Sequence, residues 1–268
     1  MPPDYHNVII GGLSSLHIFY TKKGAYTVLA IFAAAMFAAG IVYIAAGCAI
    51  KYLLANSQVP DTDTIIIDPG HGDPDGGAVG IDGVLEKDIN LAISFKLRNF
   101  FSAAGYRVIM TREGNSEIYD KGSDTIRKKK VSDLKNRLSI ANSHPGVAFL
   151  SIHQNIFSSS SSSGAIVFYS PNNDESKRLA EYIQTGIRKM VQPNNKYKVR
   201  QVNDDIFLLY NAKSPAVMVE CGFLSNPNDC RMLQDEAYQN KLAFAIFSAT
   251  LKFNAERQSK SNPKKTSV

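Results

Sequence analysis

Residues 65–86 read IIIDPGHGDPDGGAVGIDGVLE. The three isoleucines are typical of a buried strand, and Pro69 ends it because proline cannot donate a hydrogen bond to a sheet ladder. We therefore expect His71 at the carboxyl end of a strand, which is where open α/β sheets bind their ligands. A glycine-rich loop follows, and Glu86 opens a helix whose apolar residues recur at helical spacing. A loop that begins at His71 and returns at Glu86 can bring both side chains to one metal ion.

The 268-residue chain has the composition of a globular protein, with 44% hydrophobic and 20% charged residues. Strand and helix patterns alternate along residues 64–254, which predicts a single three-layer α/β domain with a mixed, largely parallel sheet flanked by helices. Within it, residues 206–210 are predicted to form a short strand and residues 228–253 to be helical in two pieces. The polar, basic tail at 255–268 is predicted to be disordered.

Residues 25–50 contain no charged residue and no proline, and about 20 apolar residues are enough to cross a membrane. We expect a transmembrane anchor here, preceded by a cytoplasmic segment at 1–24 and followed by a linker at 51–63. Lys22 and Lys23 precede the anchor, whereas few basic residues follow it. This difference favours a cytoplasmic N-terminus and an extracytoplasmic domain in the cell envelope.

Two processing alternatives apply to this anchor. Gly47-Cys48 loosely resembles a lipoprotein cleavage site, although the usual leucine three residues before the cysteine is missing. A signal-peptidase site ending at Ala55 would require a small residue where Leu53 stands. We expect an uncleaved anchor.

Cys221 and Cys230 are the only cysteines outside the predicted anchor, and no C-x-x-C pair occurs, which excludes a zinc ribbon and a redox motif. The net charge of +6 is mild. Its densest basic cluster, residues 127–130 with Lys135 and Arg137, is typical of a solvated helix face, although it could contact an anionic polymer. We expect no nucleic-acid partner.

The predicted α/β domain contains three histidines. His71 and His153 each end an apolar strand, whereas His144 precedes Pro145 in a predicted turn. A parallel sheet would bring the ends of the two strands together. A zinc site with an open position needs about three protein ligands, and Glu86 is the carboxylate best placed to complete this set.

A second carboxylate, Glu220, ends the apolar strand predicted at 216–220. Burying a carboxylate alone is costly, so Glu220 needs a partner, and water on a nearby metal ion would be a suitable one. Cys221 should point to the opposite face of the strand, where it would pack rather than react.

Two other chemistries lack their motifs. The glycine-rich loop contains neither G-x-x-x-x-G-K-[ST] nor G-x-G-x-x-G, which argues against nucleotide binding. The serine run at 158–163 offers no G-x-S-x-G elbow, so a serine hydrolase is equally disfavoured. This run is either a mobile loop bordering His153 or a plain surface linker.

Taken in order, these motifs resemble the zinc-dependent N-acetylmuramoyl-L-alanine amidases of the Amidase_3 family. The matching stretches lie within residues 64–252 and are DPGHG at 68–72, EKD at 86–88, MTR at 110–112, SIHQN at 151–155 and VECGFLSN at 219–226. The resemblance implies one Zn²⁺ per chain bound by His71, Glu86 and His153, with Glu220 as the catalytic carboxylate. It also implies that peptidoglycan is the substrate, cleaved between N-acetylmuramic acid and L-alanine.

A narrower resemblance is to membrane-anchored members of this family from endospore formers, which act in making spore cortex. It rests on residues 127–137, 205–209 and 222–227. It implies action in the forespore intermembrane space as the first step towards muramic-δ-lactam, and it leaves open whether an activating protein partner is needed. The chain departs from common family patterns at Gln154 and Cys221. Because Gln154 adjoins a predicted ligand, we expect its departure to affect substrate fit rather than zinc affinity.

The sequence leaves two other functions open. One is a zinc peptidase that acts within the stem peptide, and the other is a catalytically idle wall-binding protein. Retention of all four site residues argues against the idle protein.

Overall fold

The computed structural model describes residues 5–6, 20–21, 26, 30–40 and 64–261. The chain divides into two units, Met1–Gln58 and Val59–Val268. In the first unit, Tyr5–His6 (β1) pairs antiparallel with Tyr20–Thr21 (β2).

Residues 30–40, within the predicted anchor, are helical and exposed. Residue 26 is also described. The rest of the predicted anchor, including Cys48, lies outside the described residues, and so does the linker at 51–63. Among the helices that the structure does describe, none is long and apolar enough to cross a membrane.

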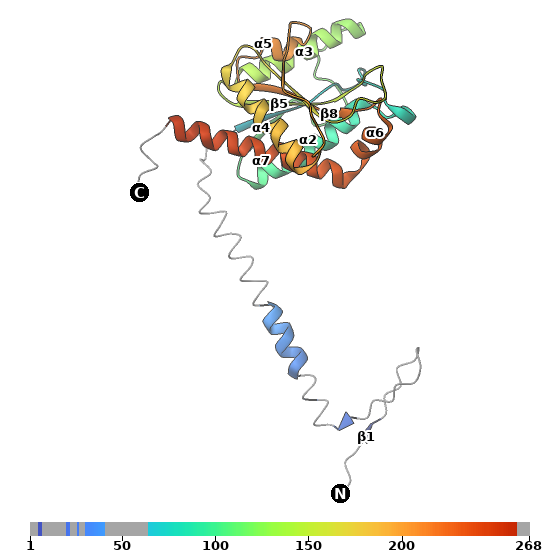
Figure 1. Cartoon of the computed structure of the whole chain (residues 1–268), viewed down its shortest axis with the longest axis vertical. Helices are drawn as coiled ribbons and strands as arrows, with labels where there is room; N and C mark the ends of the chain where they lie inside the picture. Colours follow the sequence, from blue (N-terminus) through green and yellow to red (C-terminus); the bar gives the residue numbers. More distant parts are fainter. Residues whose placement is uncertain (1–4, 7–19, 22–25, 27–29, 41–63, 262–268) are drawn as a thin grey trace. The chain divides into compact units, whose positions relative to one another are not determined.

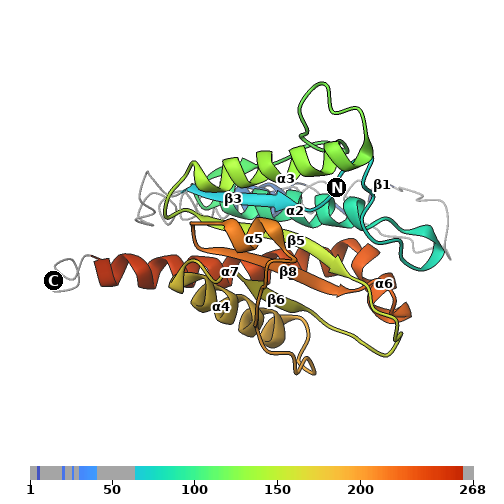
Figure 2. The ribbon, with the colours of Figure 1, turned by 90° about the horizontal axis from the view of Figure 1, so that it is seen from above.

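A six-stranded sheet forms the centre of the second unit, in the order β4-β3-β5-β8-β6-β7 (Figure 2). Neighbouring strands are parallel except β6 and β8, which are antiparallel, so the sheet is mixed and largely parallel as predicted. The strands are Thr64–Pro69 (β3), Arg107–Met110 (β4), Ala148–Asn155 (β5), Ile166–Tyr169 (β6), Arg200–Gln201 (β7) and Ala216–Phe223 (β8).

Helices cover both faces of this sheet, which completes the predicted three layers (Figure 1). One face carries α2, α4, α6 and α7, and the other carries α3 and α5. The helices are Glu86–Ala103 (α2), Ile126–Asn142 (α3), Asp174–Met190 (α4), Phe207–Asn211 (α5), Pro227–Gln234 (α6) and Glu236–Ser261 (α7), with a 3-10 turn at Ile81–Gly83 (η1).

Strand alternation distributes the apolar side chains between two cores. Ile65 and Ile67 belong to the larger core under α2 and α7, whereas Ile66 belongs to the smaller one under α3 and α5. A continuous apolar run is therefore needed in β3, because both of its faces are buried.

The predicted strand at 206–210 is wrong, since this segment forms the helix α5. Adjacent leucines explain the difference. Leu208 and Leu209 are both buried in the smaller core, while Phe207 and Tyr210 on either side are exposed. Consecutive residues share one face on a helical turn but never on a strand.

The predicted two-piece helix at 228–253 is confirmed as α6 and α7, but α7 continues to Ser261, through the first part of the predicted tail. Ion pairs hold this extension to the domain. Glu256 lies 3.5 Å from Arg178, and Arg257 lies 3.8 Å from Glu175. Residues 262–268 lie outside the described part of the chain.

Candidate metal centre

The predicted site residues lie at the carboxyl ends of three adjacent strands. His71 follows β3, whereas His153 and Glu220 lie near the ends of β5 and β8. His153 and Glu220 are partners in the parallel register, so alternation places both side chains on the same face of the sheet. His71 adopts a left-handed backbone with φ of 61°, which turns the chain sharply as it leaves β3.

Glu86, the first residue of α2, reaches the same edge and lies between the two histidines. Its Oε2 is 3.2 Å from His71 Nε2, and its Oε1 is 2.9 Å from His153 Nδ1. One ligand atom from each of the three side chains lies within 4.8 Å of the others, which is a spacing that a single metal ion can bridge. The structure therefore brings together the trio that the sequence singled out.

Two glycines make room for this trio. A Cβ at Gly70 would lie 2.2 Å from the His153 ring, and a Cβ at Gly77 would lie 2.6 Å from Glu86 Oε2. Gly77 also has φ of 72°, a conformation that favours glycine. The glycine-rich loop thus serves close packing of side chains rather than phosphate binding.

A second carboxylate, Asp75, orients His71. Its Oδ2 lies 3.1 Å from His71 Nδ1, which leaves Nε2 turned towards Glu86. Metal-binding histidines are commonly held in this way by a carboxylate on the other ring nitrogen. Asp75 was not predicted as a site residue, although it lies four residues after His71 within the stretch that resembles the amidase family.

The carboxylates of Asp75 and Glu86 favour positive charge at this site. Burial lowers the pKa of His71, but hydrogen bonds and charge from Asp75 and Glu86 outweigh this effect and raise it to about 9. Burial acts to raise the pKa of Glu86, and both histidines lower it well below its usual range. A carboxylate held between two imidazole rings is a donor set that suits Zn²⁺.

Glu220 adjoins the trio without belonging to it. Its Oε2 is fully buried and has no hydrogen-bond partner among the described residues. Burial raises the pKa of Glu220 to about 7, and the neighbouring histidines offset this only in part. A carboxyl group with a pKa near neutrality can both accept and release a proton.

A buried arginine supports the site from the α3 side. Arg137 Nη1 donates to Asp68 Oδ1 at 2.6 Å and to Pro69 O at 2.8 Å, and Nη2 donates to His71 O at 2.8 Å. Its Nε donates to Asp133 Oδ2 at 2.6 Å. The basic cluster at residues 127–130, Lys135 and Arg137 was interpreted as a solvated helix face, and this is wrong for Arg137, which is buried. The acidic residue four positions earlier, Asp133, was the available signal of a partner.

A small cleft opens beside two members of the trio, His71 and His153. It is bordered by Asp75, Glu117, Lys130 and Leu208 as well as the two histidines. Lys130 Nζ lies 2.9 Å from Asp75 Oδ2, so part of the basic cluster at the start of α3 reaches the site.

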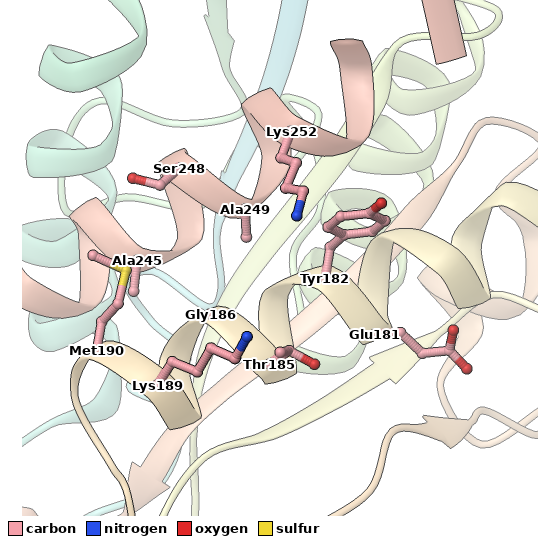
Figure 3. A pocket seen from close by; sticks show the side chains of 10 residues that line it. All are labelled: Glu181, Tyr182, Thr185, Gly186, Lys189, Met190, Ala245, Ser248, Ala249 and Lys252. Carbon is pink, nitrogen blue, oxygen red and sulfur yellow. The ribbon is translucent and has the colours of Figure 1, made fainter. Parts of the chain in front are cut away.

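A larger hollow lies elsewhere, between α4 and α7 (Figure 3). It has a volume of about 360 Å³, and Tyr182, Met190, Ala245 and Lys252 are among its lining residues. No histidine or cysteine lines it, and none of the trio borders it. The chemistry therefore belongs to the strand ends, as is usual for open α/β sheets.

Comparison with known proteins agrees with this geometry. The family model described as N-acetylmuramoyl-L-alanine amidase, Amidase_3, matches residues 65–252. A germination-specific N-acetylmuramoyl-L-alanine amidase of Bacillus subtilis (strain 168) is 36% identical over 193 residues, which are 72% of this chain and 80% of the relative.

Two solved structures show the same fold. The CwlD amidase from Clostridioides difficile, solved in complex with the GerS lipoprotein, is 42% identical with a TM-score of 0.69, over 72% of this chain and 98% of that one. An N-acetylmuramoyl-L-alanine amidase from Clostridium difficile 630 is 29% identical with a TM-score of 0.63, over 73% and 98% of the two chains. The chain belongs to the Amidase_3 family of N-acetylmuramoyl-L-alanine amidases.

Proposed function

We propose that this chain is a zinc hydrolase that cleaves the amide between N-acetylmuramic acid and the L-alanine of the peptidoglycan stem peptide. One observation carries the proposal. The ligand atoms of His71, Glu86 and His153 lie within 4.8 Å of one another. Glu220, the register partner of His153, has a buried Oε2 without a hydrogen-bond partner among the described residues. Membership of an amidase family supplies the substrate class.

The trio would hold the metal ion, and the residues around it fit that role. Asp75 fixes which nitrogen of His71 faces the site, and Gly70 and Gly77 leave space for the ligating side chains. When bound, zinc would polarise the scissile carbonyl group and acidify water.

Glu220 would carry the proton in this reaction. It would accept a proton from the attacking water and then deliver that proton to the departing amine of L-alanine. Its pKa, raised by burial to about 7 in the metal-free protein, suits a group that must both accept and release a proton. Burial of Oε2 keeps bulk water away from that oxygen.

Product analysis tests the proposal against its rivals. The zinc-loaded full chain is incubated with purified peptidoglycan, and the soluble products are identified by mass spectrometry. An amidase releases stem peptides that begin with a free L-alanine amine and leaves muramic acid with a free lactyl carboxyl group. A zinc peptidase leaves L-alanine on the sugar, and an idle wall-binding protein releases nothing.

We infer a spore-cortex role from the relatives. One is named a germination-specific amidase, and another was solved with a lipoprotein partner. Removal of the stem peptide exposes the lactyl carboxyl group that a muramic-δ-lactam requires, so this enzyme would act first in lactam formation. We also propose an activating protein partner, and an N-terminal anchor at 25–50 that places the catalytic domain outside the cytoplasm.

A further inference from the structure

Two buried amide side chains connect Glu86 to the sheet on the face opposite Glu220. Asn90 lies one helical turn after Glu86 on α2 and is fully buried. Gln154 follows His153 on β5 and is 3% exposed. Because side chains alternate along a strand, Gln154 points away from the face of His153 and towards α2.

Asn90 uses its amide group as a donor towards the metal centre. Its Nδ2 donates to Glu86 Oε1 at 3.2 Å and to Gly70 O at 3.2 Å. Both acceptors belong to the immediate frame of the trio, since Gly70 precedes His71 and packs against His153. Asn90 therefore ties the Glu86 carboxylate to the loop that presents His71.

Gln154 helps to fix which way the Asn90 amide points. Its Nε2 donates to Asn90 Oδ1 at 3.1 Å. If the Asn90 amide were flipped, its oxygen would face the Glu86 carboxylate and the Gly70 carbonyl, and its NH₂ group would face the donor of Gln154. Every contact would then oppose like with like, so the donor of Gln154 reinforces the orientation that Glu86 and Gly70 favour.

Packing alone does not account for a glutamine here. Gln154 Oε1 is buried and has no hydrogen-bond partner among the described residues, and an unpaired buried oxygen costs free energy that an apolar side chain would avoid. The nearby thiol of Cys221 interacts with the same side chain. The two positions at which the chain departs from common family patterns are thus neighbours behind the metal centre.

We propose that Gln154 is a positioning residue for the metal centre, which acts by fixing the orientation of the Asn90 amide that holds Glu86 towards the two histidines. This inference rests on the proposed zinc function. It assigns to Gln154 an effect on metal affinity that is separate from its contribution to folding. Groups that orient a metal ligand typically change metal affinity by about 10–100-fold when they are removed.

The test uses Gln154→Met, which keeps the length of the side chain and removes its donor. Gln184→Met is the matched control, because Gln184 on α4 is 2% exposed and is hydrogen-bonded at a distance from the trio. Its Oε1 accepts from Val167 N and its Nε2 donates to Ala165 O. Zinc affinity of the full chain is measured by competition with a chromophoric chelator, and thermal unfolding is followed in metal-free protein. We expect about tenfold weaker zinc binding for Gln154→Met and unchanged binding for Gln184→Met, with a lowered Tm in both.

A double variant tests the route through Asn90. Asn90→Leu should weaken zinc binding by about 10–100-fold, and adding Gln154→Met to it should cause little further loss, because the amide that Gln154 orients is already gone. If Gln154→Met fails to fold, Gln154→Leu provides the same test, since its side chain also cannot donate. Wild-type zinc affinity in the Gln154 variants, or an equal loss in the presence and absence of Asn90, would overturn the inference. A wild-type chain that binds no zinc would instead overturn the proposed function.

Discussion

His153 and Glu220 are register partners on the parallel strands β5 and β8, and their side chains project from the same face of the sheet. This relationship places a carboxylate beside a predicted metal ligand without making it part of the trio that can hold the ion. Metal binding and proton transfer are therefore assigned to different side chains, and they should be separable by mutation.

Glu220→Gln should keep zinc and the fold but lose nearly all hydrolysis. The amide is close in size to the carboxylate, so packing at the end of β8 should survive. It cannot accept a proton, and general-base assistance is typically worth about 10²–10⁴-fold in rate. Stem-peptide release from purified peptidoglycan and zinc content are measured on the same preparation.

Glu86→Gln is the paired control, because a neutral side chain between His71 and His153 should weaken the metal site itself. A Glu220→Gln enzyme that holds zinc and stays within a few-fold of wild-type activity would show that another group transfers the proton.

His153→Ala should remove most of the zinc, of which we expect one ion per chain. His153 offers one of three ligand atoms that lie within 4.8 Å of one another, and two ligands are too few for a stable zinc site. Metal content after dialysis is measured by elemental analysis. His144→Ala is the control, since His144 lies in the turn after α3 with its ring against Ser143. Full zinc occupancy in His153→Ala would refute the ligand assignment.

The trio was predictable from the sequence because it depends on local patterns. The apolar runs before His71 and His153, like the run before Glu220, are neighbouring parallel strands. Their carboxyl ends therefore lie at the same edge of the sheet. Glu86 could be added because it opens the helix that follows the first strand. None of these steps requires knowledge of side-chain contacts between distant elements.

The supporting residues were not predictable in this way. Arg137 is buried because it meets Asp68, which is 69 residues away in the chain, and nothing in its own helix specifies that contact. Asn90 and Gln154 are ordinary amides in the sequence, and only the docking of α2 against β5 gives them a shared role. The α5 helix was missed because five residues with two adjacent leucines show no helical period.

Arg137→Met should destabilise the fold strongly. The substitution leaves Asp68 and Asp133 as buried carboxylates without their cation, and breaking a buried ion pair in this way typically costs about 3–5 kcal/mol. The free energy of unfolding is measured by denaturant titration in metal-free protein. Arg127→Met, at an exposed position on the same helix, should change it by less than about 0.5 kcal/mol. Equal effects of the two substitutions would show that the buried network contributes little.

The predicted anchor should place the catalytic domain outside the cytoplasm. Lys22 and Lys23 precede the apolar segment, and basic residues are retained on the cytoplasmic side. Protease added to intact protoplasts should therefore digest the domain while residues 1–24 stay protected, as followed with antibodies to each part. Protection of the domain would reverse this topology. A lipid-modified Cys48, seen by mass spectrometry, would favour a lipoprotein instead.

Glu117→Gln should change how stability depends on pH. Burial, together with the negative charges of Asp133 and Asp75, raises the pKa of Glu117 from its ordinary value of 4.5 to about 7. The folded protein therefore binds this proton more tightly than the unfolded chain does. Stability from this group is fully present below pH 4.5 and is lost as the pH rises through about 7.

The measurement is the difference in Tm between Glu117→Gln and wild type, in metal-free protein at pH 5 and pH 8. The uncharged amide mimics the protonated acid at both pH values, so the variant should gain stability relative to wild type as the pH rises. Other titrating groups, including His71, are common to both proteins and cancel in the difference. Glu181→Gln, at an exposed position on α4, should show a Tm difference that is the same at both pH values. A constant difference for Glu117→Gln as well would mean that this carboxyl group titrates near its ordinary pKa in the folded protein.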